Sequence, residues 1–128
     1  MDTVTALKLR REGAMKVLEA ALQEAQKVGR PVSVAVVDDA GHLFAFSRTD
    51  HAELYSIPIA IAKARGAALT RFPTGKKSPT GNKRDDHHSL AITLAAGPDS
   101  FVSIPGGLRS ERKPLLPGGP CVCAQGWR

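Results

Sequence analysis

Apolar residues near the start of the chain are spaced as they are on one side of an α-helix. They recur at three- and four-residue steps from Val4 to Val28, with charged residues between them. Gly29 and Pro31 follow, and both residue types commonly end helices. The pattern predicts a long amphipathic helix from Val4 to Val28.

The next segment predicts two strands joined by a tight turn. Alternate residues of 32–37 fall on opposite faces, and both faces are apolar, so we expect this strand to be covered on both sides. Asp38 to Gly41 supply a turn, because aspartate bonds its own backbone and glycine adopts positive φ without strain. Leu43 to Phe46 return as a second strand. Together they predict a central antiparallel hairpin under helices.

Two more helices are indicated further along the chain. The first has Ser56 as a plausible N-cap and Pro58 in its first turn, and its small residues extend to Leu69. The second is expected to begin near Asp85 or Asp86, since acidic residues suit the positive end of a helix dipole.

The remaining segments predict a loop, a short strand and a turn. Residues 71–88, rich in Gly, Pro, Ser and Lys, are expected to form a ligand-contacting or mobile loop before the last helix, whose apolar residues include Leu90 and Leu94. Residues 100–104 read as a short strand. The glycines of 105–107 allow the backbone to approach other groups closely.

Composition indicates one globular domain. The chain has 128 residues, 42% of them hydrophobic, which is enough for a core without disulfide or metal staples. Aromatic residues are few, so we expect no base-stacking nucleic-acid surface. No apolar run reaches the roughly 18 residues of a membrane span. The first residues do not resemble a signal peptide, and we expect a cytoplasmic protein without a membrane partner.

The formal charge of +6 is unevenly distributed along the chain. Positive residues gather in the 71–84 segment, namely Arg71, Lys76, Lys77, Lys83 and Arg84. Such a segment attracts carboxylates, phosphates or the propionates of a tetrapyrrole, although a solvated loop has the same composition. Cys121 and Cys123 lack the further ligands of a zinc site, and we interpret them as incidental.

His87 and His88, after Asp85 and Asp86, form the densest group of metal-ligating residues. Neighbouring helical positions diverge by about 100 degrees, so both histidines cannot face one metal. Either one is a candidate axial ligand for heme iron. The alternative is a polar helix start whose acids complement the dipole and whose histidines lie in solvent.

The order of several short motifs resembles one family. A long helix leads to V-x-V-x-V-V-D-x-x-G-x-L, then R-x-D, an alanine-rich helix with K-A, and an isolated P-G-G. This order, over residues 6–108, resembles the GlcG/HbpS family of heme-binding or heme-degrading domains, also found fused to PduO-type cobalamin adenosyltransferases. The resemblance implies a profilin-like α/β (α+β) fold, with a central five-stranded antiparallel sheet between helices in an α/β/α arrangement. It also implies homo-oligomers that bind heme, a related tetrapyrrole or another small anionic molecule.

The resemblance also implies site residues. Arg48 and Asp50 would line a pocket together with Lys63 on the following helix, and an arginine fork suits a propionate. His51, in the same loop, would lie beside them. The alternative for Arg48 and Asp50 is an ion pair that holds strand to helix. With His87 and His88, these residues complete the candidate cofactor site.

The C-terminal segment departs from the family pattern. Relatives continue with two more strands and a helix, whereas residues 109–128 are rich in Pro and Gly and show no clean alternation. We therefore divide the chain into a domain at 1–108 and an atypical tail at 109–128. A heme-binding protein is favoured over an enzyme. The alternatives are an accessory protein or enzyme of hydroxy-acid or diol catabolism, and a defective relative with a structural role only.

Overall fold

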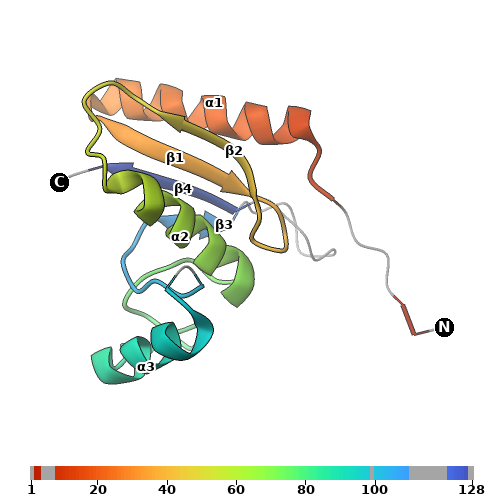
Figure 1. Ribbon diagram of the computed structural model, residues 1–128, viewed down its shortest axis with the longest axis vertical. Helices are drawn as coiled ribbons and strands as arrows, with labels where there is room; N and C mark the ends of the chain where they lie inside the picture. The colour runs from red at the N-terminus through yellow and green to blue at the C-terminus, as the bar shows by residue number, and fades with distance from the viewer. Residues whose placement is uncertain (1, 4–7, 99, 110–120, 127–128) are drawn as a thin grey trace.

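In the described part of the chain, two helices enclose a four-stranded antiparallel sheet. The computed structural model describes residues 2–3, 8–98, 100–109 and 121–126. Its elements are α1 (Arg11–Val28), β1 (Val32–Val37), β2 (Leu43–Arg48), α2 (Ser56–Thr70), α3 (Asp86–Ala96), β3 (Gly107–Arg109) and β4 (Cys121–Gly126). The strand order is β2-β1-β4-β3, and α1 and α2 pack on opposite faces (Figure 1). This confirms the α/β/α class and antiparallel sheet, with four described strands where the resemblance implied five.

The central strand β1 is buried on both faces, as predicted. All six of its residues are buried. Val32, Val34 and Val36 point toward α1, where they meet Ala14 and Leu18. Because these β-branched side chains are stiff and suit a pleated surface, burying them toward a helix stabilises the strand at little entropic cost.

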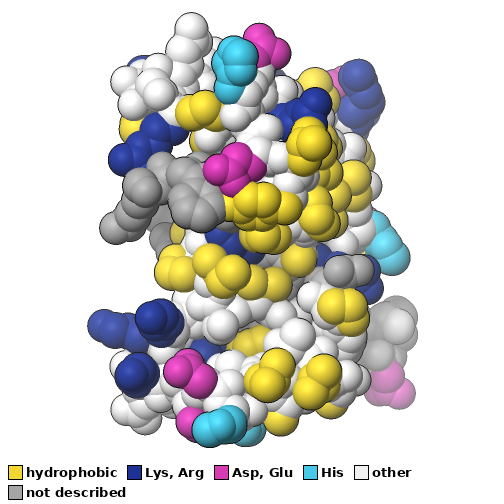
Figure 2. All heavy atoms as spheres, turned by 60° about the vertical axis from the view of Figure 1, so that its left-hand side comes forward, with side chains coloured by type: hydrophobic (Ala, Val, Ile, Leu, Met, Phe, Trp, Pro, Cys, Tyr) yellow, Lys and Arg dark blue, Asp and Glu magenta, His cyan; other side chains and the backbone are white. Residues whose placement is uncertain are grey.

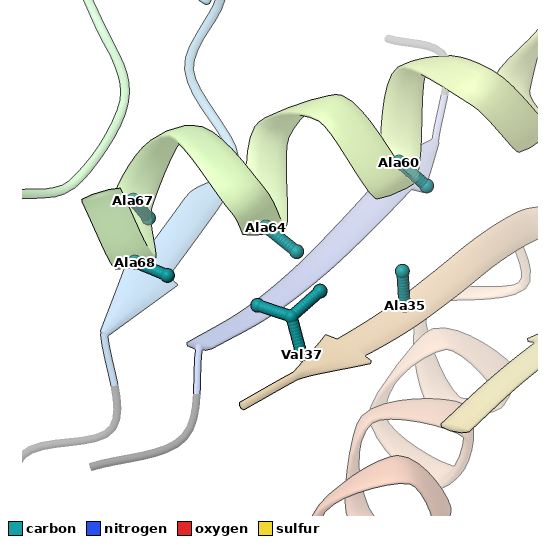
Figure 3. Packing of buried hydrophobic residues seen from close by; sticks show 6 residues of the cluster. All are labelled: Ala35, Val37, Ala60, Ala64, Ala67 and Ala68. Carbon is teal, nitrogen blue, oxygen red and sulfur yellow. The ribbon is translucent and has the colours of Figure 1, made fainter. Parts of the chain in front are cut away.

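The opposite face of β1 carries smaller side chains and receives α2. Ala35 and Val37 meet an alanine stripe on α2, formed by Ala60, Ala64, Ala67 and Ala68 (Figure 3). The steps of three and four residues place these alanines on one side of the helix. Their short side chains let the helix lie close to the sheet.

The β1–β2 turn closes as the sequence predicts. The Oδ1 atom of Asp38 accepts hydrogen bonds from the backbone N–H groups of Ala40, at 3.0 Å, and His42, at 2.9 Å. Gly41 has a φ of 84°, in the left-handed region that glycine enters without strain. This local chemistry fixes the hairpin register.

The first helix is shorter at its start than predicted. It begins at Arg11, and Arg10 precedes it in an extended conformation; Val4 lies outside the described residues. Lys8, just upstream, instead reaches the β1–β2 turn and pairs with Asp39 at 2.7 Å. The end was predicted correctly, because Gly29 caps α1 with a φ of 72°.

Ser56 does not cap α2 and is its first residue; that prediction was wrong. Its hydroxyl bonds the carbonyl of Glu53 and lies 2.6 Å from the Oγ atom of buried Ser33. The serine therefore joins α2 to β1, and no side chain caps the start of α2. Pro58 is in the first turn, as predicted.

Two predictions after α3 were also wrong. Residues 100–104 have no ladder partner among the described residues, and Phe101 is buried as part of a loop. The tail, expected to lack a strand, contains β4, which pairs with β1 on one side and β3 on the other. The boundary at 108 stays a prediction. None of the described helices is long and apolar enough to cross a membrane.

Gly107 is the point where β3 comes closest to α2. A Cβ atom at this position would lie 2.4 Å from the carbonyl oxygen of Lys63 and 2.8 Å from the Thr74 side chain. We predict that Gly107→Ala lowers the free energy of unfolding by about 2 to 3 kcal/mol, because backbone must move to admit the methyl group.

Urea denaturation measures this effect, and Gly13→Ala is the matched control. Gly13 lies inside α1, and an added Cβ there meets only the tip of the Leu9 side chain. Alanine is favoured over glycine in a helix, so the control is expected to be neutral or stabilising by up to about 1 kcal/mol. Equal stability of Gly107→Ala and wild type would contradict the close packing.

The Lys8–Asp39 pair has a measurable pH signature. The hydrogen bond that Lys8 donates to Asp39 lowers the pKa of the Asp39 carboxyl below its ordinary value. A lowered pKa in the folded state stabilises the fold above the unfolded pKa, and this contribution is lost as pH falls through the folded pKa. We predict that Lys8→Met raises the pKa of Asp39 in an NMR titration. An unchanged value would show that the pair does not persist in solution.

Candidate functional site

The β2–α2 connection carries three of the predicted site residues, all exposed. Arg48 ends β2 opposite Ser33, and Asp50 and His51 follow in the loop. His51 has a φ of 65°, which is uncommon outside glycine. Within the described part of the chain no ion pair joins Arg48 to Asp50, so the alternative of a structural pair is not supported.

Lys63 lies elsewhere in the fold. It is only 3% exposed, and its backbone carbonyl faces Gly107 on β3. Among the described strands β2 and β3 are the two edges of the sheet, so Arg48 is at least three strand spacings, roughly 14 Å or more, from the Gly107 that Lys63 contacts. One pocket containing both side chains stays a prediction.

Asp50 lines a solvent-open hollow of about 450 Å³ that the sequence did not indicate. The hollow lies between the C-terminal half of α1 and the end of β2, and its other polar walls include Glu19, Gln23 and Ser47. Further along the β2–α2 connection, desolvation together with the Glu53 carboxylate raises the pKa of Tyr55 to about 12.

The start of α3 confirms the predicted helix boundary. Asp85 is the N-cap, and its Oδ2 atom accepts a hydrogen bond from the backbone N–H of His88 at 3.1 Å. The imidazoles of His87 and His88 are exposed. Among the described residues no three His, Cys, Asp or Glu side chains gather as a metal site. The proposed metal role of the two histidines therefore stays a prediction.

The two histidines differ in what lies beside them on α3. His87 shares one side of the helix with Leu90, Ala91 and Leu94, which follow it at steps of three, four and seven residues. Leu90 is 57% exposed and Leu94 is 75% exposed. His88 lies about 100 degrees around the helix. This side of α3 was not among the predicted sites, although the spacing of His87, Leu90 and Leu94 is visible in the sequence.

The basic loop before α3 is compact. Lys77 and Lys83 form an isolated antiparallel bridge, and the backbone N–H of Arg84 donates to the carbonyl of Lys76 at 2.7 Å. Arg84 also lies over the ring of Phe101, 5.1 Å from its centroid. Lys76, Lys77 and Lys83 are exposed. These contacts hold three ammonium groups on one short loop next to α3.

Charged and apolar side chains occur together at this end of the molecule. Figure 1 places α3 at the lower end, apart from the sheet, and α3 packs against no other described helix or strand. Figure 2 shows His, hydrophobic and Lys or Arg side chains near one another at the same end. The arrangement offers an apolar surface with imidazole and ammonium groups at its margin.

A family model described as "Haem degrading protein HbpS-like" matches residues 9–114. The chain belongs to the HbpS-like family. This confirms the resemblance drawn from the motif order. The match includes α1, α2 and α3, with both groups of candidate residues.

A curated relative shares part of the sequence of this HbpS-like chain. Protein GlcG of Escherichia coli (strain K12) is 43% identical over 70 residues, which cover 55% of this chain and 52% of GlcG. The chain thus spans about half the length of the curated relatives that it matches.

Solved structures share the fold. HbpS of Streptomyces reticuli, solved as a double mutant, is 27% identical with a TM-score of 0.72, covering 98% of this chain and 79% of HbpS. Protein ORFY of Klebsiella pneumoniae gives a TM-score of 0.75 at 20% identity, covering 99% of this chain and 84% of ORFY. A PduOC:heme complex gives a TM-score of 0.63 at 22% identity, covering 97% of this chain and 85% of the PduOC chain. At these lower identities the last two show the fold alone.

The cap of α3 can be tested directly. We predict that Asp85→Ala destabilises α3 by about 1 kcal/mol, because the N–H of His88 loses its acceptor. Hydrogen exchange of α3 amides should accelerate, while exchange in β1 stays unchanged. Asp85→Asn is the control, since its amide oxygen can also cap the helix. Faster exchange in both variants would indicate that charge, and not the capping bond, holds this end.

Proposed function

We propose that this protein binds heme or a related tetrapyrrole on the exposed side of α3. The observation that carries the proposal is the shared side of His87, Leu90, Ala91 and Leu94. A porphyrin has an apolar face and an iron that accepts neutral imidazole. The leucines would cover the ring while His87 reaches the iron.

Three ammonium groups support the same placement. Lys76, Lys77 and Lys83 are exposed on the compact loop that leads into α3. Porphyrin propionates are anionic, and lysine acts as a point charge on a flexible stem that adapts to their position. The side of α3 and the loop together match a ligand with an apolar plane and a negative edge.

The comparisons support the ligand class. The family model is described as haem degrading, and a protein with the same fold forms a heme complex. We propose binding and assign no catalytic step to any residue. Metal coordination through His87, with His88 as the nearest alternative, is part of the proposal. Arg48 and Lys63 are a second, less compact candidate for propionate contacts, with Asp50 and His51 next to Arg48 as candidate pocket residues.

We also propose a cytoplasmic homo-oligomer. Large apolar side chains are exposed away from α3, with Val28 at 65%, Leu54 at 72% and Leu108 at 60%. Contiguous apolar surface marks sites of association, and these three side chains, on separate elements, are candidates for contacts with a second copy. Such contacts would remove part of their surface from water.

A heme titration followed by absorbance tests the proposal. We predict a saturable Soret shift for the wild type, a loss of affinity of about tenfold or more for His87→Ala, and a change within about twofold for His88→Ala. The two variants differ by one position, so they share any general effect of removing an imidazole. Leu94→Glu should weaken binding without changing the fold, because Leu94 is exposed.

Circular dichroism of each apo variant separates binding from folding. A folded wild type without a Soret shift would contradict heme binding. A greater loss of heme affinity for His88→Ala than for His87→Ala would overturn the assignment of His87 to the iron. Loss of binding only when His51 is replaced would move the site to the β2–α2 connection.

A further inference from the structure

The hollow beside the end of α1 is separate from the proposed heme surface. It lies on the α1 side of the sheet, whereas α2 covers the other face and α3 lies beyond α2 (Figure 1). Its volume of about 450 Å³ is within the usual range of small-molecule sites. We propose that it binds a small polyhydroxylated primary amine, of the size of an amino sugar.

Negative potential in the hollow supports a cationic ligand. Glu19 contributes a carboxylate from α1 and Asp50 contributes one from the β2–α2 loop. The C-terminal end of α1 forms part of the same wall, and it is the negative end of the helix dipole. Arg30 is the one cation among the described lining residues. An ammonium group complements this balance better than a carboxylate does.

Hydrogen-bonding groups in the lining support hydroxyls on the ligand. Gln23 and Gln26 project from α1 and Ser47 from β2. Amides and hydroxyls both donate and accept hydrogen bonds, which is what a polyol requires. Leu22 and Pro31 add apolar surface against which the C–H groups of a sugar ring can lie.

The wall that carries Asp50 is fixed before any ligand arrives. The Oγ1 atom of Thr49 accepts a hydrogen bond from the N–H of Val32 at 2.8 Å and donates to its carbonyl at 3.2 Å. The backbone N–H of Thr49 also donates to this carbonyl, at 2.9 Å. These three bonds tie the loop to the start of β1. Pre-organised groups lose less entropy when a ligand binds.

Three hexose derivatives of similar size and different charge test the proposal. We predict that glucosamine, at a pH where its amine is protonated, gives saturable shifts of amide resonances in the second half of α1 and in 47–50. Its affinity should exceed that of glucose by about fivefold or more, the effect of one partly screened charge pair. Gluconate should give no saturable shift.

Variants of the wall provide the second arm of the test. Glu19→Gln and Asp50→Asn should each weaken glucosamine binding by about fivefold. Glu12→Gln is the matched control, because Glu12 is on the first turn of α1 and outside the hollow. Glucose or gluconate binding as tightly as glucosamine, no saturable shift in the folded wild type, or an equal effect of Glu12→Gln would overturn the proposal. Asp50 also belongs to the second heme candidate, so the comparison of sugars and the Glu19→Gln variant are the readouts that are independent of heme binding.

Discussion

Burial of β1 on both faces is the constraint on which the rest of the structure depends. Its valines face α1, while Ala35 and Val37 face the alanine stripe of α2. The same strand pairs with β2 on one side and β4 on the other. Both helices and both neighbouring strands therefore contact one six-residue segment. A strand in that position tolerates neither a polar side chain without a partner nor a change of register.

Small residues set the distance between α2 and the sheet. The alanines of α2 permit a close approach, and Gly107 lets β3 reach the backbone of the same helix. Ser33, the one polar side chain in β1, is accommodated because Ser56 supplies a hydroxyl partner. α3 lies outside this core, since it packs against no other described helix or strand. Its apolar side is thus available for a ligand.

Local signals made much of this fold predictable from sequence. Hydrophobic periodicity gave α1 and the hairpin, and Asp38 with Gly41 gave the turn between them. β4 could not be predicted, since its segment has little alternation and becomes a strand through pairing with β1, 84 or more positions upstream. The hollow at Asp50 was equally hidden, because only the folded topology brings the end of β2 to α1. The side of α3 that carries His87 was readable from its spacing.

The most direct test of the account is NMR of the protein with ferric heme, whose unpaired electrons broaden nearby amide resonances. Binding on α3 predicts broadening in 86–96 and in the basic loop at 76–84, with sharp resonances at 48–51. Broadening at 48–51 together with unaffected resonances in α3 would contradict the assigned surface and place the ligand at the β2–α2 connection.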